Sequence, residues 1–115
     1  MITVGNPYRP EEGAKYVLSD GKRTLELHQV LGLAHSATML LAYLPNEKVL
    51  VQADLWHAHA EGEPLPAPIP AEITFYNNVK RLKLDVSRII GVHGAVGTMA
   101  DLERHVGPTA ARARQ

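Results

Sequence analysis

The sequence predicts an α/β (α+β) chain: a mixed β-sheet with two helices on one face. Residues 23–30 alternate between apolar and polar side chains, as in a strand with one covered face. Residues 38–44 and 49–53 are apolar without alternation, which is typical of strands covered on both faces. Residues 71–84 place apolar side chains at spacings of three and four, which indicates one amphipathic helix.

The N-terminal part of the chain is predicted to form a hairpin. Residues 1–15 are rich in Gly, Pro and charge, and we expect an irregular lead-in there. Residues 16–18 form the first strand, and Asp20-Gly21 indicates a tight turn because both residue types tolerate positive φ. The partner strand, 23–30, has two unlike faces, so one face of the hairpin is expected to be wet or at an edge. Leu25 and Leu27 share its apolar face, and Thr24, Glu26 and His28 share its polar face.

The middle of the chain is predicted to complete the sheet. A turn at 45–48 joins the two apolar strands, and residues 88–92 form the last strand. Residues 57–70 hold two His, two Glu and four Pro, and form a surface loop. Pro70 falls in the first turn of the helix that follows, where its missing N–H costs nothing.

A short helix is predicted at the C-terminal end. Thr98 and Asp101 form its N-terminal cap, and it runs through His105. Gly107-Pro108 ends it, because neither residue favours a helix interior. Residues 107–115 are then a flexible tail.

Length and composition limit the class of protein. A chain of 115 residues makes one domain, residues 1–115, with room for a core. Its formal net charge is zero, so no long-range field attracts nucleic acid or an anionic membrane, and nothing repels one copy from another. The absence of cysteine excludes disulfides and cysteine-based zinc sites. The start has no leader pattern and no apolar stretch is long enough to span a bilayer, so we expect a cytoplasmic protein.

Three isolated polar residues lie where apolar strands begin or end: His35, Asp54 and His93. Asp54 and His93 directly follow predicted strands, whereas His35 precedes the strand that pairs with the Asp54 strand. Antiparallel pairing puts the start of one strand beside the end of the next, so His35 and Asp54 can meet at one rim. Two imidazoles and a carboxylate suit zinc. The sequence therefore predicts a metal site made of these three residues.

Other interpretations of the trio stay open. His35 could be a loop residue bonded to the backbone, Asp54 could cap the turn after its strand, and His93 could belong to an ordinary turn. Sets of three such residues also arise by chance.

The other histidines are assigned no ligand role. His28 is interpreted as structural, and His57 and His59 as part of the surface loop. His105 lies near the predicted C-terminus of the last helix, where a cation is favoured.

The same residues, in this order, resemble three motifs of the metallo-β-lactamase-fold hydrolases. His35-Ser36 resembles the third motif, Val49 to Asp54 the fourth, whose Asp bridges two metals, and Ile89 to Gly94 the fifth. The connecting segments 39–48 and 78–89 are similar to those of a subset of members. The resemblance runs from residue 16 to residue 106, and it implies the C-terminal half of the αββα fold.

The resemblance also implies an incomplete site. The family's second motif, His-x-His-x-Asp-His, supplies most of the ligands and normally lies upstream, in the first half of the fold. Residues 57–61 imitate its start, but they follow Asp54 and lack the Asp-His ending. The resemblance therefore implies a half domain with a partial ligand set for zinc. No catalytic residue is assigned, and we expect the isolated chain to be inactive.

A sheet with helices on one side leaves its other face uncovered, so the apolar strands between residues 38 and 53 demand a second layer. The family fold packs two similar halves sheet to sheet about a pseudo-two-fold axis, so we expect a homodimer through the exposed sheet. One alternative is a metal-dependent hydrolase whose site is assembled across the dimer. Another is a module that binds a partner chain carrying the missing half. Fold alone does not choose the substrate.

Overall fold

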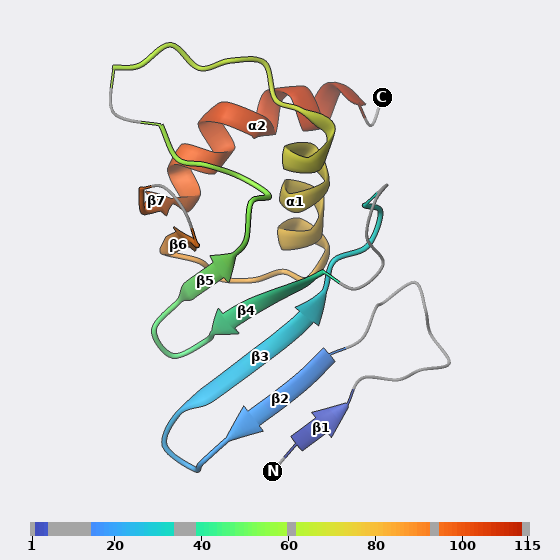
Figure 1. The fold of residues 1–115 in the computed structure, drawn as a ribbon, viewed down its shortest axis with the longest axis vertical. Helices are drawn as coiled ribbons and strands as arrows, with labels where there is room; N and C mark the ends of the chain where they lie inside the picture. Colours follow the sequence, from blue (N-terminus) through green and yellow to red (C-terminus); the bar gives the residue numbers. More distant parts are fainter. Residues whose placement is uncertain (1, 5–14, 34–38, 60–61, 93–94, 114–115) are drawn as a thin grey trace.

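Seven strands form one mixed sheet in which the spatial order follows the chain order, as Figure 1 shows. The computed structural model describes residues 2–4, 15–33, 39–59, 62–92 and 95–113. The elements are β1 (Ile2–Val4), β2 (Lys15–Ser19), β3 (Thr24–Gln29), β4 (Leu40–Leu44), β5 (Val49–Gln52), α1 (Pro70–Arg81), β6 (Arg88–Gly91), β7 (Gly97–Thr98) and α2 (Met99–Ala113). The predicted α/β (α+β) class, a mixed sheet with two helices, is confirmed.

All neighbouring strands pair antiparallel except β5 and β6, which are parallel. A parallel pair cannot be joined by a tight turn, because the chain must return to the starting end of the sheet. The proline-rich segment and α1 supply that return. The parallel pair therefore fixes where the helical layer begins.

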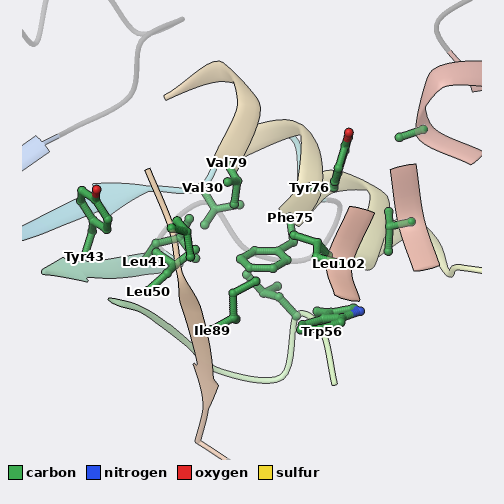
Figure 2. Packing of buried hydrophobic residues seen from close by; sticks show 14 residues of the cluster. Val30, Leu41, Tyr43, Leu50, Trp56, Phe75, Tyr76, Val79, Ile89 and Leu102 are labelled. Carbon is green, nitrogen blue, oxygen red and sulfur yellow. The ribbon is translucent and has the colours of Figure 1, made fainter. Parts of the chain in front are cut away.

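The core lies between the helices and the β4–β6 part of the sheet. Figure 2 shows Phe75 of α1 at its centre, between Leu102 of α2 and the strand residues Leu50 and Ile89. All four side chains are essentially inaccessible to solvent. Leu50 and Ile89 are register partners across the parallel pair, so they point to the same face of the sheet. That shared face is the one the helices cover.

The opposite face of the sheet is apolar, and no described helix covers it. We call it the open face. Opposed residues on paired strands share a face, and the register pairs Leu18 with Leu25, Leu27 with Ala42, and Ala42 with Val51. None of these five residues belongs to the core cluster or to the partly buried side chains packed on it. Leu18 is 38% exposed, and Leu40, which shares this face with Ala42, is 39% exposed.

The alternation in β3 was predicted, and the structure gives its direction. The polar face, with Glu26 and His28, is the one turned toward the helices, since His28 lies opposite the fully buried Leu41. His28 is buried, and its Nε2 lies 2.8 Å from Oε1 of Glu26. The leucine face is the open one. A buried histidine bonded to a neighbouring carboxylate fits the predicted structural role.

Two short strands were missed. β1 pairs with β2 inside the segment predicted to be an irregular lead-in, so that prediction is wrong for residues 2–4. β7 has two residues and pairs with β6 directly before α2. Strands this short carry no periodic signal in the sequence. They form because the edge of an existing sheet offers unpaired backbone groups.

The first helix is shorter than predicted. Pro70 occupies its first turn as expected, and Glu72 accepts a hydrogen bond from the Ile69 backbone N–H at 2.9 Å. The helix ends at Arg81 instead of residue 84, because Leu82 caps it and Lys83 turns left-handed with φ +54°. The chain can then re-enter the sheet at β6.

The second helix is longer than predicted. Its capping box is present, since the Asp101 N–H donates to Thr98 Oγ1 at 3.1 Å and the Thr98 N–H to Asp101 Oδ2 at 3.0 Å. The predicted end at Gly107-Pro108 is wrong: the helix continues to Ala113, through most of the predicted tail. Pro108 removes one backbone donor, but Val106 and Ala110 are fully buried in the core where α1 and α2 pack. Tertiary packing therefore outweighs the local stop signal.

Replacing Gly97 with Ala should destabilise the protein. A Cβ at Gly97 would lie 2.7 Å from the Trp56 ring and 2.9 Å from the Ala58 Cβ, and neither group has room to move away. Overpacking of this kind costs about 1–3 kcal/mol, which corresponds to a melting temperature lower by at least roughly 4 °C. Gly107→Ala is the matched control, because its Cβ would come close, at 2.8 Å, only to the flexible end of Glu103, while Tyr76 would lie at ordinary contact distances of 3.5 and 3.8 Å. Equal melting temperatures for the two variants would contradict this account.

Stability should fall in mildly acidic solution because of His28. Burial lowers the pKa of His28 below 6.5, more strongly than Glu26 raises it. At a pH between the two pKa values, His28 binds a proton in the unfolded chain but not in the folded one. The contribution of neutral His28 to the free energy of unfolding is therefore fully present above pH 6.5 and is lost as the pH falls through the lower pKa of the folded state. His28→Gln should show a smaller drop in melting temperature between pH 8 and pH 5.5 than the wild type, and the exposed His57→Gln should not. An unchanged drop in His28→Gln would count against the assignment.

Candidate metal centre at the strand rim

The ends of β5 and β6 and the start of β4 lie at one rim of the sheet. Gln52 and Gly91 are register partners, and the next N–H, of Val92, donates to the Gln52 carbonyl at 3.1 Å. Ala42 pairs antiparallel with Val51, which puts the start of β4 beside the end of β5. The predicted convergence of these strand ends is confirmed for the backbone.

Of the three predicted ligands, the structure describes Asp54. It follows β5 in an exposed turn and has a left-handed backbone, with φ +57°. His35 and His93 lie outside the described residues, so the metal site of His35, Asp54 and His93 stays a prediction. Within the described ranges, no three His, Asp or Glu side chains are grouped to hold a metal.

The Asp54 corner is built by one buried side chain, Gln52. Gln52 is 2% exposed. Its Oε1 accepts from the backbone N–H of Leu55 at 2.9 Å and of Trp56 at 3.2 Å, while its Nε2 donates to the Trp56 carbonyl at 2.6 Å. Gln52 therefore closes a loop around residues 53 and 54, and it pairs the backbone N–H groups of Leu55 and Trp56 and the Trp56 carbonyl.

The far end of the corner is anchored to α2. The buried indole Nε1–H of Trp56 donates to Nδ1 of His105 at 3.0 Å, and Nε2 of His105 lies 2.9 Å from the Pro66 carbonyl. With Nδ1 accepting, the proton belongs on Nε2 and is donated to Pro66, so the imidazole is neutral. His105 is buried in the middle of α2 and is not a cation at a helix end; that prediction is wrong because the helix is longer than expected.

Sequence reasoning missed Gln52 and the contact between Trp56 and His105. One signal was available: Gln52 interrupts an apolar strand at a position that shares its face with Leu50. A polar residue on a buried face needs hydrogen-bond partners. Gln52 is 3 residues from Leu55 and 4 from Trp56 in the sequence, whereas Trp56 is 49 residues from His105. A contact across 49 residues cannot be predicted from a local sequence pattern.

The loop histidines His57 and His59 lie in the segment between β5 and α1. His57 is exposed. The His59 ring makes an edge contact with His105 at 5.0 Å between centroids, and its Nδ1 lies 3.7 Å from Glu63. His59 and Glu63 also line a pocket of about 730 Å³, bounded on the far side by Ala95 and Val96 and by the Asp101–Arg104 ion pair. Two of the charged groups that line this pocket, Asp101 and Arg104, are paired with each other.

Neither of the two described helices is both long and apolar enough to cross a bilayer.

Comparison with known proteins gives matches of structure only. No protein-family model and no curated protein matches the sequence. The structure is similar to rubredoxin:oxygen oxidoreductase from Desulfovibrio gigas, with a TM-score of 0.56 and 20% identity over 86% of this chain and 30% of that one. It is also similar to a metallo-β-lactamase from Pontibacter korlensis, with a TM-score of 0.54 and 18% identity over 79% of this chain and 43% of that one.

An archaeal metallo-β-lactamase superfamily protein from Sulfolobus tokodaii matches with a TM-score of 0.54 and 15% identity, over 80% of this chain and 36% of the other. The chain therefore spans less than half the length of each of these proteins. Identities this low carry the fold and not the activity. What these matches show is the fold alone: this chain has part of the metallo-β-lactamase fold.

Proposed function

We propose that this chain is an incomplete metallo-β-lactamase-like domain that lacks the His-x-His-x-Asp-His motif, is not an independent hydrolase, and self-associates. The open face of the sheet is the observation that carries this proposal. A sheet with helices on one side is stable when its other apolar face is covered. Leu18 and Leu40, at 38% and 39% exposed, are large apolar side chains on that face.

A second copy is a suitable cover. Strands lie about 4.8 Å apart and rise about 3.4 Å per residue, so a sheet of this size presents on the order of 500 Å² in projection, and more once side-chain relief is included. A standard interface buries about 800 Å² on each partner. The residues of β3, β4 and β5 whose side chains lie on the open face are all uncharged. Two copies could therefore pack through these strands without repulsion between like charges.

Self-association should depend on the open face. The wild type should be a dimer at micromolar concentration by native mass spectrometry and light scattering. Leu40→Glu should shift it to monomer, because pairing would bury two carboxylates without partners. Leu65→Glu is the matched control: Leu65 is also 39% exposed, but it lies in the proline-rich loop. A wild type that stays monomeric at 100 μM, or equal dissociation by both variants, would overturn the proposal.

The second candidate is a metal-dependent hydrolase whose site is assembled across a homodimer, or with a partner chain that supplies the missing half. The Asp54 corner favours it. A non-glycine residue with left-handed backbone is unfavourable by itself and is enriched at functional sites. Asp54, together with His35 and His93, would hold zinc through a carboxylate and two imidazoles. A bound zinc ion acts as a Lewis acid toward a substrate oxygen.

This chain's own contribution to such a site is positional. Asp54 offers a carboxylate on a corner of the rim, and the described residues contain no group of three His, Asp or Glu side chains that could hold a metal. The other two predicted ligands, His35 and His93, lie outside the described residues, so the described residues of one subunit do not by themselves make up a coordination shell. This is why assembly and metal content must be measured together.

Metal binding should be lost in Asp54→Ala. Native mass spectra of protein purified without chelator report assembly and metal in one experiment. The assembled-hydrolase proposal expects a dimer carrying stoichiometric zinc in the wild type and a metal-free dimer in Asp54→Ala, with His57→Ala as the control that retains metal. A metal-free wild-type dimer refutes the hydrolase proposal and leaves the inactive half domain. Metal retained in Asp54→Ala would show that the site lies elsewhere.

A further inference from the structure

We propose that Gln52 is the positioning residue of Asp54: its buried amide holds the left-handed corner that presents the Asp54 carboxylate at the rim. The inference rests on the proposed function only where it treats Asp54 as a ligand. The corner and its hydrogen bonds are properties of described residues.

The first step is that the intrinsic backbone preference of Asp54 does not explain its left-handed conformation. A left-handed backbone crowds the Cβ of any residue other than glycine. Glycine would relieve that crowding, yet the chain has Asp there, with φ +57°. Asp tolerates the left-handed region better than most residues but does not require it. Something outside residue 54 must therefore select the corner.

The second step is that Gln52 makes that selection. Its three hydrogen bonds all cross from the end of β5 to Leu55 and Trp56, so Ala53 and Asp54 are the two residues enclosed between the ends. An amide is the side chain that satisfies this pattern, since it offers a lone-pair acceptor to two N–H groups and a donor to one carbonyl. Leu55 and Trp56 are both buried. Without the amide, their backbone groups would be left without partners away from water.

The third step is that the far end of the corner cannot drift to compensate. The Trp56 indole is bonded to His105 of α2, and its ring packs where the missing side chain of Gly97 would be. Both ends of the corner are thus fixed, one by β5 and one by α2 and β7. The carboxylate of Asp54 is consequently presented from a preorganised support, as a metal ligand requires.

The test uses Gln52→Leu, which keeps the size of the side chain and removes all three hydrogen bonds. Backbone chemical shifts of Asp54 report whether its φ is positive. We expect the left-handed signature to be lost in this variant while the signals of α1 stay in place. We also expect zinc affinity to fall at least tenfold. Retention of the left-handed signature, or unchanged zinc affinity, would overturn the inference.

The two proposals fail in different ways. If the wild type binds no zinc, the hydrolase proposal fails, and the chemical shifts of Asp54 in Gln52→Leu still decide the role of Gln52. If the wild type binds zinc and Asp54→Ala does not, any loss of affinity in Gln52→Leu acts through the corner.

A second variant covers the case in which Gln52→Leu does not fold. Gln52→Glu keeps the acceptor oxygens, and only its protonated form can donate to the Trp56 carbonyl. Burial raises the pKa of such a carboxyl, so its protonated form persists in mildly acidic solution and its stabilising effect is lost as pH rises through that pKa. The gap in melting temperature to the wild type should therefore be smaller at pH 5 than at pH 8.

The wild type measured at each pH removes the common effect of His105, the titratable group that contacts Trp56. Gln29→Glu, at a half-buried position of β3, is the matched control and should show a constant gap. The inference would also be overturned if the difference in melting temperature between Gln52→Glu and the wild type were the same at pH 5 and pH 8. That result would mean that the pattern of donor and acceptors at this position does not matter.

Discussion

The parallel pairing of β5 with β6 is the contact on which the rest of the structure depends. It is the one parallel pair among the described strands, and it obliges the chain to cross from one end of the sheet to the other between them. That crossing supplies α1, and α1 supplies Phe75, around which the core is packed. The same pairing puts the ends of two adjacent strands at one rim, so the helical layer and the candidate site have a common origin.

The rim end of the core is polar, and its polar groups are satisfied. Gln52 closes the Asp54 corner, and Trp56 and His105 join that corner to α2. Networks of this kind are costly when a member lacks a partner and rigid when all are paired. An apolar residue at position 52 would pack as well as Gln52, but it would leave the corner without a defined shape.

Much of the fold could be predicted from the sequence because its main elements have strong periodic signals. Residues 49–52 lie within the predicted strand, α1 occupies 70–81 where a helix over 71–84 was predicted, and the Thr98–Asp101 cap begins α2 as expected. The errors come from tertiary effects. α2 passes Gly107-Pro108 because packing against α1 outweighs a local stop, and β1 and β7 form because a sheet edge is available.

The candidate site was less predictable than the fold. The rim could be foreseen, since strand direction alone decides which ends meet, and Asp54 is placed on it. The corner at Asp54 could not, because its left-handed backbone depends on hydrogen bonds from Gln52 and on a tryptophan anchored by His105, which is 49 residues further along the chain. Periodicity reports burial; it does not report which buried polar atoms meet.

The open face and the rim belong to the same sheet, and this links the two proposals geometrically. Two sheets packed face to face keep their strands within about 30° of parallel or antiparallel alignment. In a two-fold dimer through the open face, the axis lies in the interface. If it runs along the strands, both rims fall at the same end of the dimer, and the two Asp54 corners approach one another where the axis passes close to β5. If it runs across the strands, the rims point to opposite ends and no shared site forms. Self-association is therefore necessary for a site built from two copies but not sufficient, and the direction of the two-fold axis decides between an assembled metal centre and an inactive half domain that only covers its own apolar face.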